Sequence, residues 1–96
     1  MNNKIHVYDF EEAASLVAAG FMTMMIEEGF STWREMVKCY WWSASDIVDE
    51  VRSILEDITD ASMFDDGSFI KVCGDILPYK DFKKMLIQKF KEENKY

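Results

Sequence analysis

The chain of 96 residues has few residues that break or cross-link a backbone: one proline, four glycines and two cysteines. So little glycine and proline excludes a collagen-like or low-complexity chain. Histidine is as scarce as proline, because His6 is the only one, and it forms no recognisable motif with a serine or cysteine nucleophile. The sequence also lacks a phosphate-binding glycine loop, an HExxH motif and a CxxC pair. We therefore predict a protein that is not an enzyme and that holds no metal or cofactor.

Two alternatives to that prediction depend on residues that are distant in the sequence. A zinc site would need His6, Cys39, Cys73 and a carboxylate to converge in the fold. An enzyme would be favoured only if His6, a cysteine and a carboxylate lay together in one pocket, since the members of a triad need not be close in sequence. Otherwise we expect both cysteines to be reduced, small core residues, as is usual in the cytoplasm.

Long apolar runs are missing as well. The longest nearly uncharged stretch covers residues 13–26, which is shorter than the roughly 20 residues that a membrane span needs. The first residues, Met1 to Lys4, lack the apolar run and the cleavage site of a signal peptide. We therefore expect a cytoplasmic protein with no membrane contact, in which residues 13–26 belong to a buried helix.

The chain is rich in apolar material and in negative charge. Hydrophobic residues make up 49% of it, which is enough for the core of one compact domain covering residues 1–96. The formal net charge is −7, but residues 1–79 carry 15 acidic and 5 basic side chains, whereas residues 80–96 carry 3 acidic and 6 basic ones. An acidic body repels nucleic acids and anionic membranes, and it favours a protein partner with a basic surface.

Hydrophobic periodicity predicts a mainly α fold of the α+β class, with about four helices and a small β-hairpin between the third and the fourth. The helices are expected over residues 10–28, 33–42, 46–60 and 79–93, and the hairpin over residues 69–77. Asp9 and Thr32 are candidate N-caps, each with a glutamate three residues later, and Gly29 is a candidate helix end. Residues 5–8 are expected to form an edge strand. The helix 10–28 is apolar almost all round, which places it at the centre of the fold or at a dimer interface.

The third predicted helix carries a row of carboxylates beside its apolar stripe. The row consists of Asp46, Asp49, Glu50, Glu56, Asp57 and Asp60, and the turn that follows adds Asp65 and Asp66. Side chains three or four residues apart on a helix lie about 5–6 Å apart, which is close to the spacing of phosphates along a nucleic-acid strand. The row either presents carboxylates where a DNA-binding protein expects phosphates, or it is the solvated face of an ordinary amphipathic helix.

The adjacent pair Trp41 and Trp42 is the second candidate binding feature. Adjacent residues of a helix point about 100° apart, so Trp42 lies at the edge of the core or outside it if Trp41 faces inward. Tryptophan is enriched at binding hot spots. Trp42 is therefore a candidate for a partner or dimer interface, and the alternative is that neighbouring elements cover both rings.

These features predict a small acidic binding protein, most simply an inhibitor or regulator that occludes the basic site of a nucleic-acid-binding protein. In size and charge the chain is similar to small acidic proteins with which phages block host or defence enzymes, some of which imitate DNA. That similarity implies a DNA-mimic role with no direct contact to nucleic acid. The alternative is a homo-oligomeric helical adaptor or structural protein, possible as a homodimer, that assembles through the apolar surface of helix 10–28 and Trp42.

Overall fold

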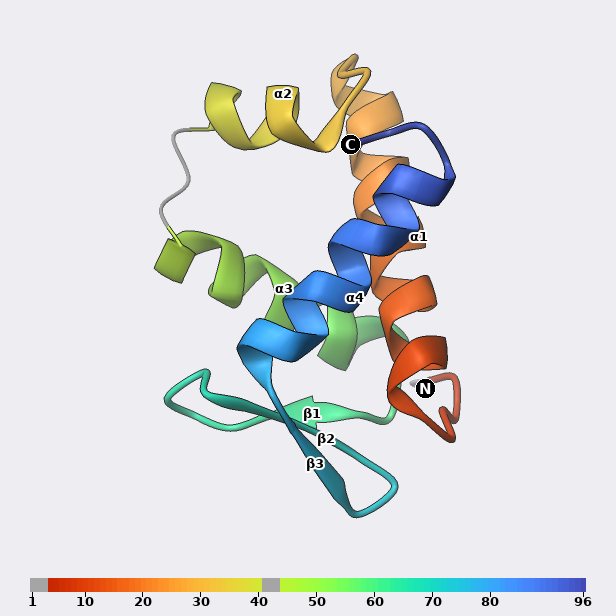
Figure 1. Cartoon of the computed structure of the whole chain (residues 1–96), viewed down its shortest axis with the longest axis vertical. Coiled ribbons are helices and arrows are strands. Elements are labelled where there is room, and N and C mark those ends of the chain that lie inside the picture. The colour runs from red at the N-terminus through yellow and green to blue at the C-terminus, as the bar shows by residue number, and fades with distance from the viewer. Residues whose placement is uncertain (1–3, 41–43) are drawn as a thin grey trace.

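The structure is a computed structural model that describes residues 4–40 and 44–96, with the backbone alone for residues 44–46. Its elements follow in the order α1 (Phe10–Glu28), α2 (Trp33–Cys39), α3 (Ala44–Ile58), β1 (Ser62–Met63), β2 (Phe69–Val72), β3 (Asp75–Pro78) and α4 (Tyr79–Glu92) (Figure 1). The predicted mainly α fold with a small β part between the third and fourth helices is confirmed. Trp41, Trp42 and the side chain of Asp46 lie outside the described residues, so the expectations placed on them stay predictions.

The N-terminus of α1 lies where the sequence predicts it, because local side chains cap its free N–H groups. The Asp9 carboxylate accepts a hydrogen bond from Glu12 N at 2.8 Å, and the Glu12 carboxylate accepts one from Tyr8 N at 3.3 Å. The helix ends before Gly29, whose φ of 81° suits a residue without a side chain. The other three helices all pack against α1, so the expectation of a central helix is confirmed. Ile26, near its C-terminal end, is 74% exposed.

The other helix boundaries differ from the predicted ones by one to three residues. Among the described residues α2 ends at Cys39, α3 spans 44–58 instead of 46–60, and α4 ends at Glu92. No single described helix is long and apolar enough to cross a membrane. Taken together, α1 and α2 have the length and the apolar composition of a membrane span, but the pair is bent by 65°. The helices therefore form where the apolar periodicity indicates, and their ends are set by contacts that the periodicity does not contain.

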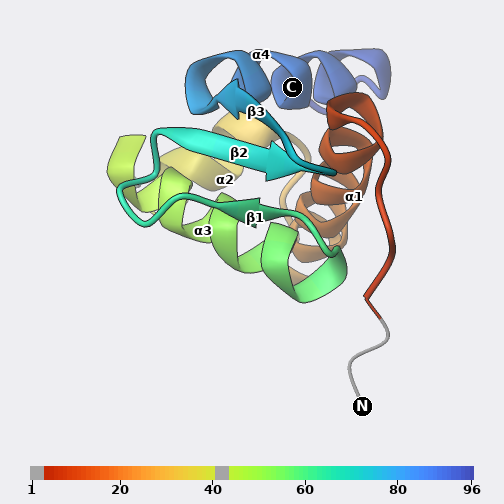
Figure 2. The same cartoon turned by 90° about the horizontal axis from the view of Figure 1, so that it is seen from below.

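The sheet is antiparallel, with the strand order β1-β2-β3. The predicted hairpin is confirmed as β2 and β3, whose register pairs Val72 with Asp75 and leaves Cys73 and Gly74 as a two-residue turn. These two residues have φ values of 51° and 86°, as a tight hairpin turn of the type I′ kind requires. The short strand β1 was not predicted. Figure 2 shows the sheet in front of the helices, with α4 beside β3 and α3 beside β1.

The N-terminal segment runs in extended form beside the C-terminal end of α3. Ile5 N donates to Ile58 O at 2.8 Å, and Asp60 N donates to Ile5 O at 3.0 Å. In the described part of the chain, the predicted edge strand is reduced to this parallel bridge between Ile5 and Thr59. Val7 is fully buried and anchors the segment in the core. The bridge fixes the residues on either side of it, and His6 is one of them.

The prediction that both cysteines are buried core residues is wrong. Both are free thiols, as expected, but both are exposed. Cys39 is the last residue of α2, and Cys73 occupies the first position of the β2–β3 turn. In the turn, Cys73 contacts the N-terminal segment, where its thiol donates to Val7 O at 3.0 Å, and it is not enclosed in the core.

Candidate functional site

The carboxylates of α3 lie on the side of the helix away from its buried stripe. That stripe consists of Ile47, Val51 and Leu55, which are 5%, 0% and 0% exposed. Asp49 and Asp57 are exposed, and Glu50 and Glu56 are half-buried. The amphipathic division of this helix was therefore predicted correctly, whereas the use of its outer face remains a hypothesis.

Three of the predicted site residues hold the fold together. The Glu56 carboxylate accepts a hydrogen bond from Met63 N at 3.1 Å and so fastens β1 to α3. The Asp66 carboxylate accepts from Ser68 N at 3.0 Å, and the Ser68 hydroxyl beside it lowers the pKa of Asp66. Asp60, the third, bonds to the N-terminal segment. These three carboxylates accept hydrogen bonds from other groups of the chain, and they are therefore less available to a partner protein.

Arg52 interrupts the row of carboxylates. Its guanidinium donates to the Asp49 carboxylate at 3.1 Å and to the carbonyl oxygens of Phe64 and Asp65 at 3.0 Å each. It thereby holds the β1–β2 loop against the first half of α3 and places a positive charge inside the acidic face. Glu50, Asp57 and Asp65 are the predicted site residues whose side chains make no hydrogen bond or ion pair with another described residue.

An exposed aromatic pair lies beside these carboxylates. The rings of Phe64 and Phe69 are 5.5 Å apart between centroids, and the two residues are 39% and 37% exposed. Ile76, on the next strand, is 52% exposed. Residues alternate between the faces of a strand, and the inward neighbours Met63 and Ile70 are buried. The contact between these two rings was not predicted, because no strand was expected before residue 69.

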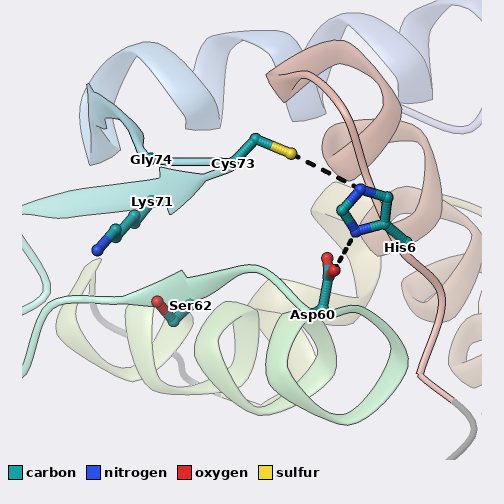
Figure 3. A pocket seen from close by; sticks show the side chains of 6 residues that line it. All are labelled: His6, Asp60, Ser62, Lys71, Cys73 and Gly74. Atoms are coloured by element: carbon teal, nitrogen blue, oxygen red, sulfur yellow. Dashed lines mark hydrogen bonds and ion pairs between the residues drawn. The ribbon is translucent and has the colours of Figure 1, made fainter.

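The structure also brings together His6, Asp60 and Cys73, which come from three different segments (Figure 3). The Nδ1 atom of His6 is hydrogen-bonded to Oδ2 of Asp60. On the other side of the ring, Nε2 lies 3.9 Å from Sγ of Cys73. The three side chains line a hollow of about 320 Å³. Its described lining consists of His6, Asp60, Ser62, Lys71, Cys73 and Gly74.

Hydrogen bonds indicate which atoms of this cluster donate a proton and which accept one. The His6 hydrogen bond and, after it, the Val7 N–H lower the pKa of Asp60, so its carboxylate is ionised at neutral pH. An ionised carboxylate accepts only, and therefore Nδ1 of His6 carries a proton and donates it. In the neutral ring Nε2 is then an acceptor that faces Cys73. The thiol itself donates to Val7 O at 3.0 Å.

A histidine, a cysteine and a carboxylate lie together in one pocket, which is the arrangement that would favour an enzyme. The described residues do not form the zinc site that would also include Cys39. Within residues 4–40 and 44–96, no group of three or more histidine, cysteine, aspartate or glutamate residues is placed to hold a metal ion. Cys39 lies on α2, at the end of the molecule away from the sheet (Figure 1). No local sequence signal joins the three residues of the cluster, because Cys73 falls in the turn predicted after the strand and was expected to be buried.

A comparison with protein-family models, with curated proteins and with solved structures finds no match for this chain. Its function is therefore argued from its own residues.

Proposed function

We propose that the chain is a small acidic protein that binds another protein and occludes a basic, nucleic-acid-binding site on it. The surface that supports this proposal is made of α3 and the β1–β2 loop. It carries the carboxylates of Asp49, Glu50, Asp57, Asp65 and Asp66 and the rings of Phe64 and Phe69, and we call it the α3–loop surface. The partner is a protein and not a nucleic acid, because phosphates would be repelled by these carboxylates.

One observation carries the proposal: exposed carboxylates lie next to an exposed aromatic pair. Binding interfaces typically combine a buried aromatic anchor with a polar rim. Phe64 and Phe69 supply such an anchor. Asp65 follows Phe64 in the chain, and Arg52, which bonds to the carbonyl oxygens of both, joins the loop to the Asp49 carboxylate. A purely solvated helix face does not need exposed phenylalanines, so the combination favours a docking surface over the alternative of simple solvation.

The mechanism would be competitive occlusion. Negative charge on one face attracts a basic partner over long range and raises the association rate, and this attraction weakens as salt screens it. The Arg52–Asp49 ion pair reduces the local charge, so the surface is not a uniform copy of a phosphate row. Recognition would therefore depend on the aromatic anchor as well as on charge.

Affinity capture from the native host tests the proposal, with the tagged chain as bait. The test variant replaces three side chains that make no hydrogen bond or ion pair with another described residue: Glu50→Gln, Asp57→Asn and Asp65→Asn. The control variant removes the same number of charges elsewhere: Glu27→Gln, Glu92→Gln and Glu93→Gln. We expect the wild-type chain and the control to recover proteins that act on DNA or RNA, and the test variant to lose them while it keeps its helical circular dichroism.

Salt dependence is the second readout. Recovery of the partner should fall steeply as the salt concentration rises, because the encounter depends on screened charges. A partner that binds equally well at low and high salt, or that binds the test variant as well as the control, would show that the carboxylates are only solvated.

A further inference from the structure

We propose that Cys73 is a nucleophile, activated by His6 and oriented through Asp60, that accepts the acyl group of a small ester or thioester. This activity is independent of the α3–loop surface. The two features involve different side chains, since the cluster lies where the β2–β3 turn meets the N-terminal segment (Figure 3).

The three groups of the cluster lie in the order that nucleophilic catalysis needs. A carboxylate, an imidazole and a thiol follow one another, with the Asp60 bond at one ring nitrogen and the thiol at the other. This order lets the ring accept a proton from sulfur while the carboxylate stabilises the resulting imidazolium. The distance of 3.9 Å between Nε2 and Sγ is long, but such contacts are often loose before substrate binds.

Little movement separates the present geometry of the Cys73 thiol from a productive one. The thiol hydrogen now points to Val7 O at 3.0 Å. Rotation about the Cβ–Sγ bond alone turns that hydrogen towards Nε2 of His6. The ring is held meanwhile by Asp60, which is itself fixed by the Val7 N–H at 3.1 Å.

The groups present favour acyl transfer over dithiol chemistry. A dithiol mechanism would need a second cysteine nearby, and Cys39, the only other one in the sequence, lies on α2 at the far end of the molecule (Figure 1). Acyl transfer needs no redox partner and uses only the groups present. The hollow of about 320 Å³ in front of Sγ has room for a small acyl donor.

The thiol proton moves from Sγ to Nε2 of His6, and sulfur forms a bond to the carbonyl carbon of the donor. The bond from that carbon to the leaving oxygen or sulfur breaks, and the leaving group takes the proton from His6. Water then attacks the acyl-thioester with His6 as base, which releases a carboxylic acid and restores the Cys73 thiol.

The chain contains its own control for the first test. Cys39 and Cys73 are both exposed thiols, but only Cys73 has a histidine beside it, because His6 is the sole histidine. Iodoacetamide labelling of the wild-type protein near pH 7, followed by peptide mass spectrometry, compares the two thiols in one sample. We expect Cys73 to react about tenfold faster or more, in line with the effect of a positioned base. In His6→Gln the two rates should become similar.

The second test uses p-nitrophenyl acetate as the acyl donor. We expect release of nitrophenolate with transient acetylation of Cys73, retained in Cys39→Ser and lost in Cys73→Ser. In His6→Ala the rate should fall and should recover when free imidazole is added, which a structural role of the histidine would not produce. Asp60→Asn should slow acetylation, and Asp60→Glu should restore part of the rate.

Equal labelling of the two thiols in the folded wild-type protein overturns the proposal without any variant. Acetyl groups found on lysines or on Cys39 and not on Cys73 overturn it as well. Loss of activity in His6→Ala without rescue by imidazole, in a variant that melts like the wild type, shows that His6 does not act as the base.

Discussion

A methyl group added at Gly20 of α1 would lie 2.7 Å from Cγ2 of Ile54 in α3, so the two helices approach at a distance that only glycine permits there. Glycine inside a helix lowers stability by about 1 kcal/mol relative to alanine. The close packing of α1 on α3 compensates for that loss. Gly20 is relevant to both the α3–loop surface and the His6–Asp60–Cys73 cluster, because α3 carries the carboxylates and leads directly into Asp60.

We expect Gly20→Ala to lower the free energy of unfolding by up to about 2 kcal/mol, because overpacking costs about 1–3 kcal/mol and the helix gains about 1 kcal/mol. Urea denaturation measures the change. Ser15→Ala, at an exposed position of α1, serves as the control and should change stability by a few tenths of a kcal/mol, about the difference in helix propensity. In the double variant Gly20→Ala with Ile54→Ala, the new methyl group occupies vacated space. The two losses should therefore be less than additive, and strict additivity would contradict the close contact.

The Tyr79 hydroxyl is buried and has no hydrogen-bond partner in the described part of the chain. A buried polar group without a partner costs about 1–3 kcal/mol. We therefore expect Tyr79→Phe to leave the free energy of unfolding unchanged or to raise it by about 1 kcal/mol. Tyr96→Phe is the matched comparison, because the Tyr96 oxygen accepts a hydrogen bond from Arg34, which lowers its pKa. That variant should be the less stable of the two in urea denaturation.

Tyr79 also predicts how stability responds to alkali. Burial raises the pKa of Tyr79 to about 12, whereas a tyrosine in the unfolded chain ionises near pH 10. The unfolded state then loses its proton first, so the stability that the neutral phenol contributes is complete below about pH 10 and is lost as the pH rises towards 12. Tyr79→Phe should flatten this decline. An identical decline in the variant and the wild type would mean that the phenol is not shielded.

Local signals made most of the fold predictable. The Asp9 and Thr32 side chains accept hydrogen bonds from backbone N–H groups three residues later, and Gly29 ends α1 by its own conformational freedom. These features can be read within a few residues of sequence. The hairpin was predictable for the same reason, since alternating residues and a turn signal lie side by side in the chain.

The candidate cluster was not predictable, because the contacts that assemble it join distant residues. His6 and Asp60 are 54 positions apart, and His6 and Cys73 are 67 apart. They meet only through the bridge between Ile5 and Thr59 and through β1, a strand of two residues that is too short to show alternation. The exposure of Cys73 likewise follows from its place in a turn and not from its residue type.

Thr59 connects α3 to the segment that carries Asp60. Its buried hydroxyl donates to Leu55 O at 2.7 Å and accepts from Ala61 N at 3.1 Å. We expect Thr59→Val to lower the free energy of unfolding by about 1–3 kcal/mol, because the buried N–H of Ala61 loses its acceptor. Thr59→Ser keeps both hydrogen bonds and should lose only about 1 kcal/mol for the missing methyl group. Thermal and urea denaturation of the two variants separate these effects, and equal losses would show that the hydroxyl is not needed.

The ion pair of Asp60 with His6 predicts a response to acid. The hydrogen bonds from His6 and from Val7 N lower the pKa of Asp60 in the folded chain. The unfolded state therefore binds a proton first as the pH falls, below about pH 4. The stability contributed by the carboxylate is complete above that pH and is lost as the pH decreases through the folded value.

We expect Asp60→Asn to weaken the loss of stability as the pH falls below about 4, measured as the free energy of unfolding at a series of acidic pH values. Asp57→Asn removes an exposed carboxylate of α3 without a hydrogen bond to another described residue, and it should leave the acid profile close to that of the wild type. If both variants follow the wild-type profile, Asp60 is not held by His6 in solution. The orientation of the imidazole towards Cys73 would then lose its support, because the same hydrogen bond determines both the acid response and the order of the cluster.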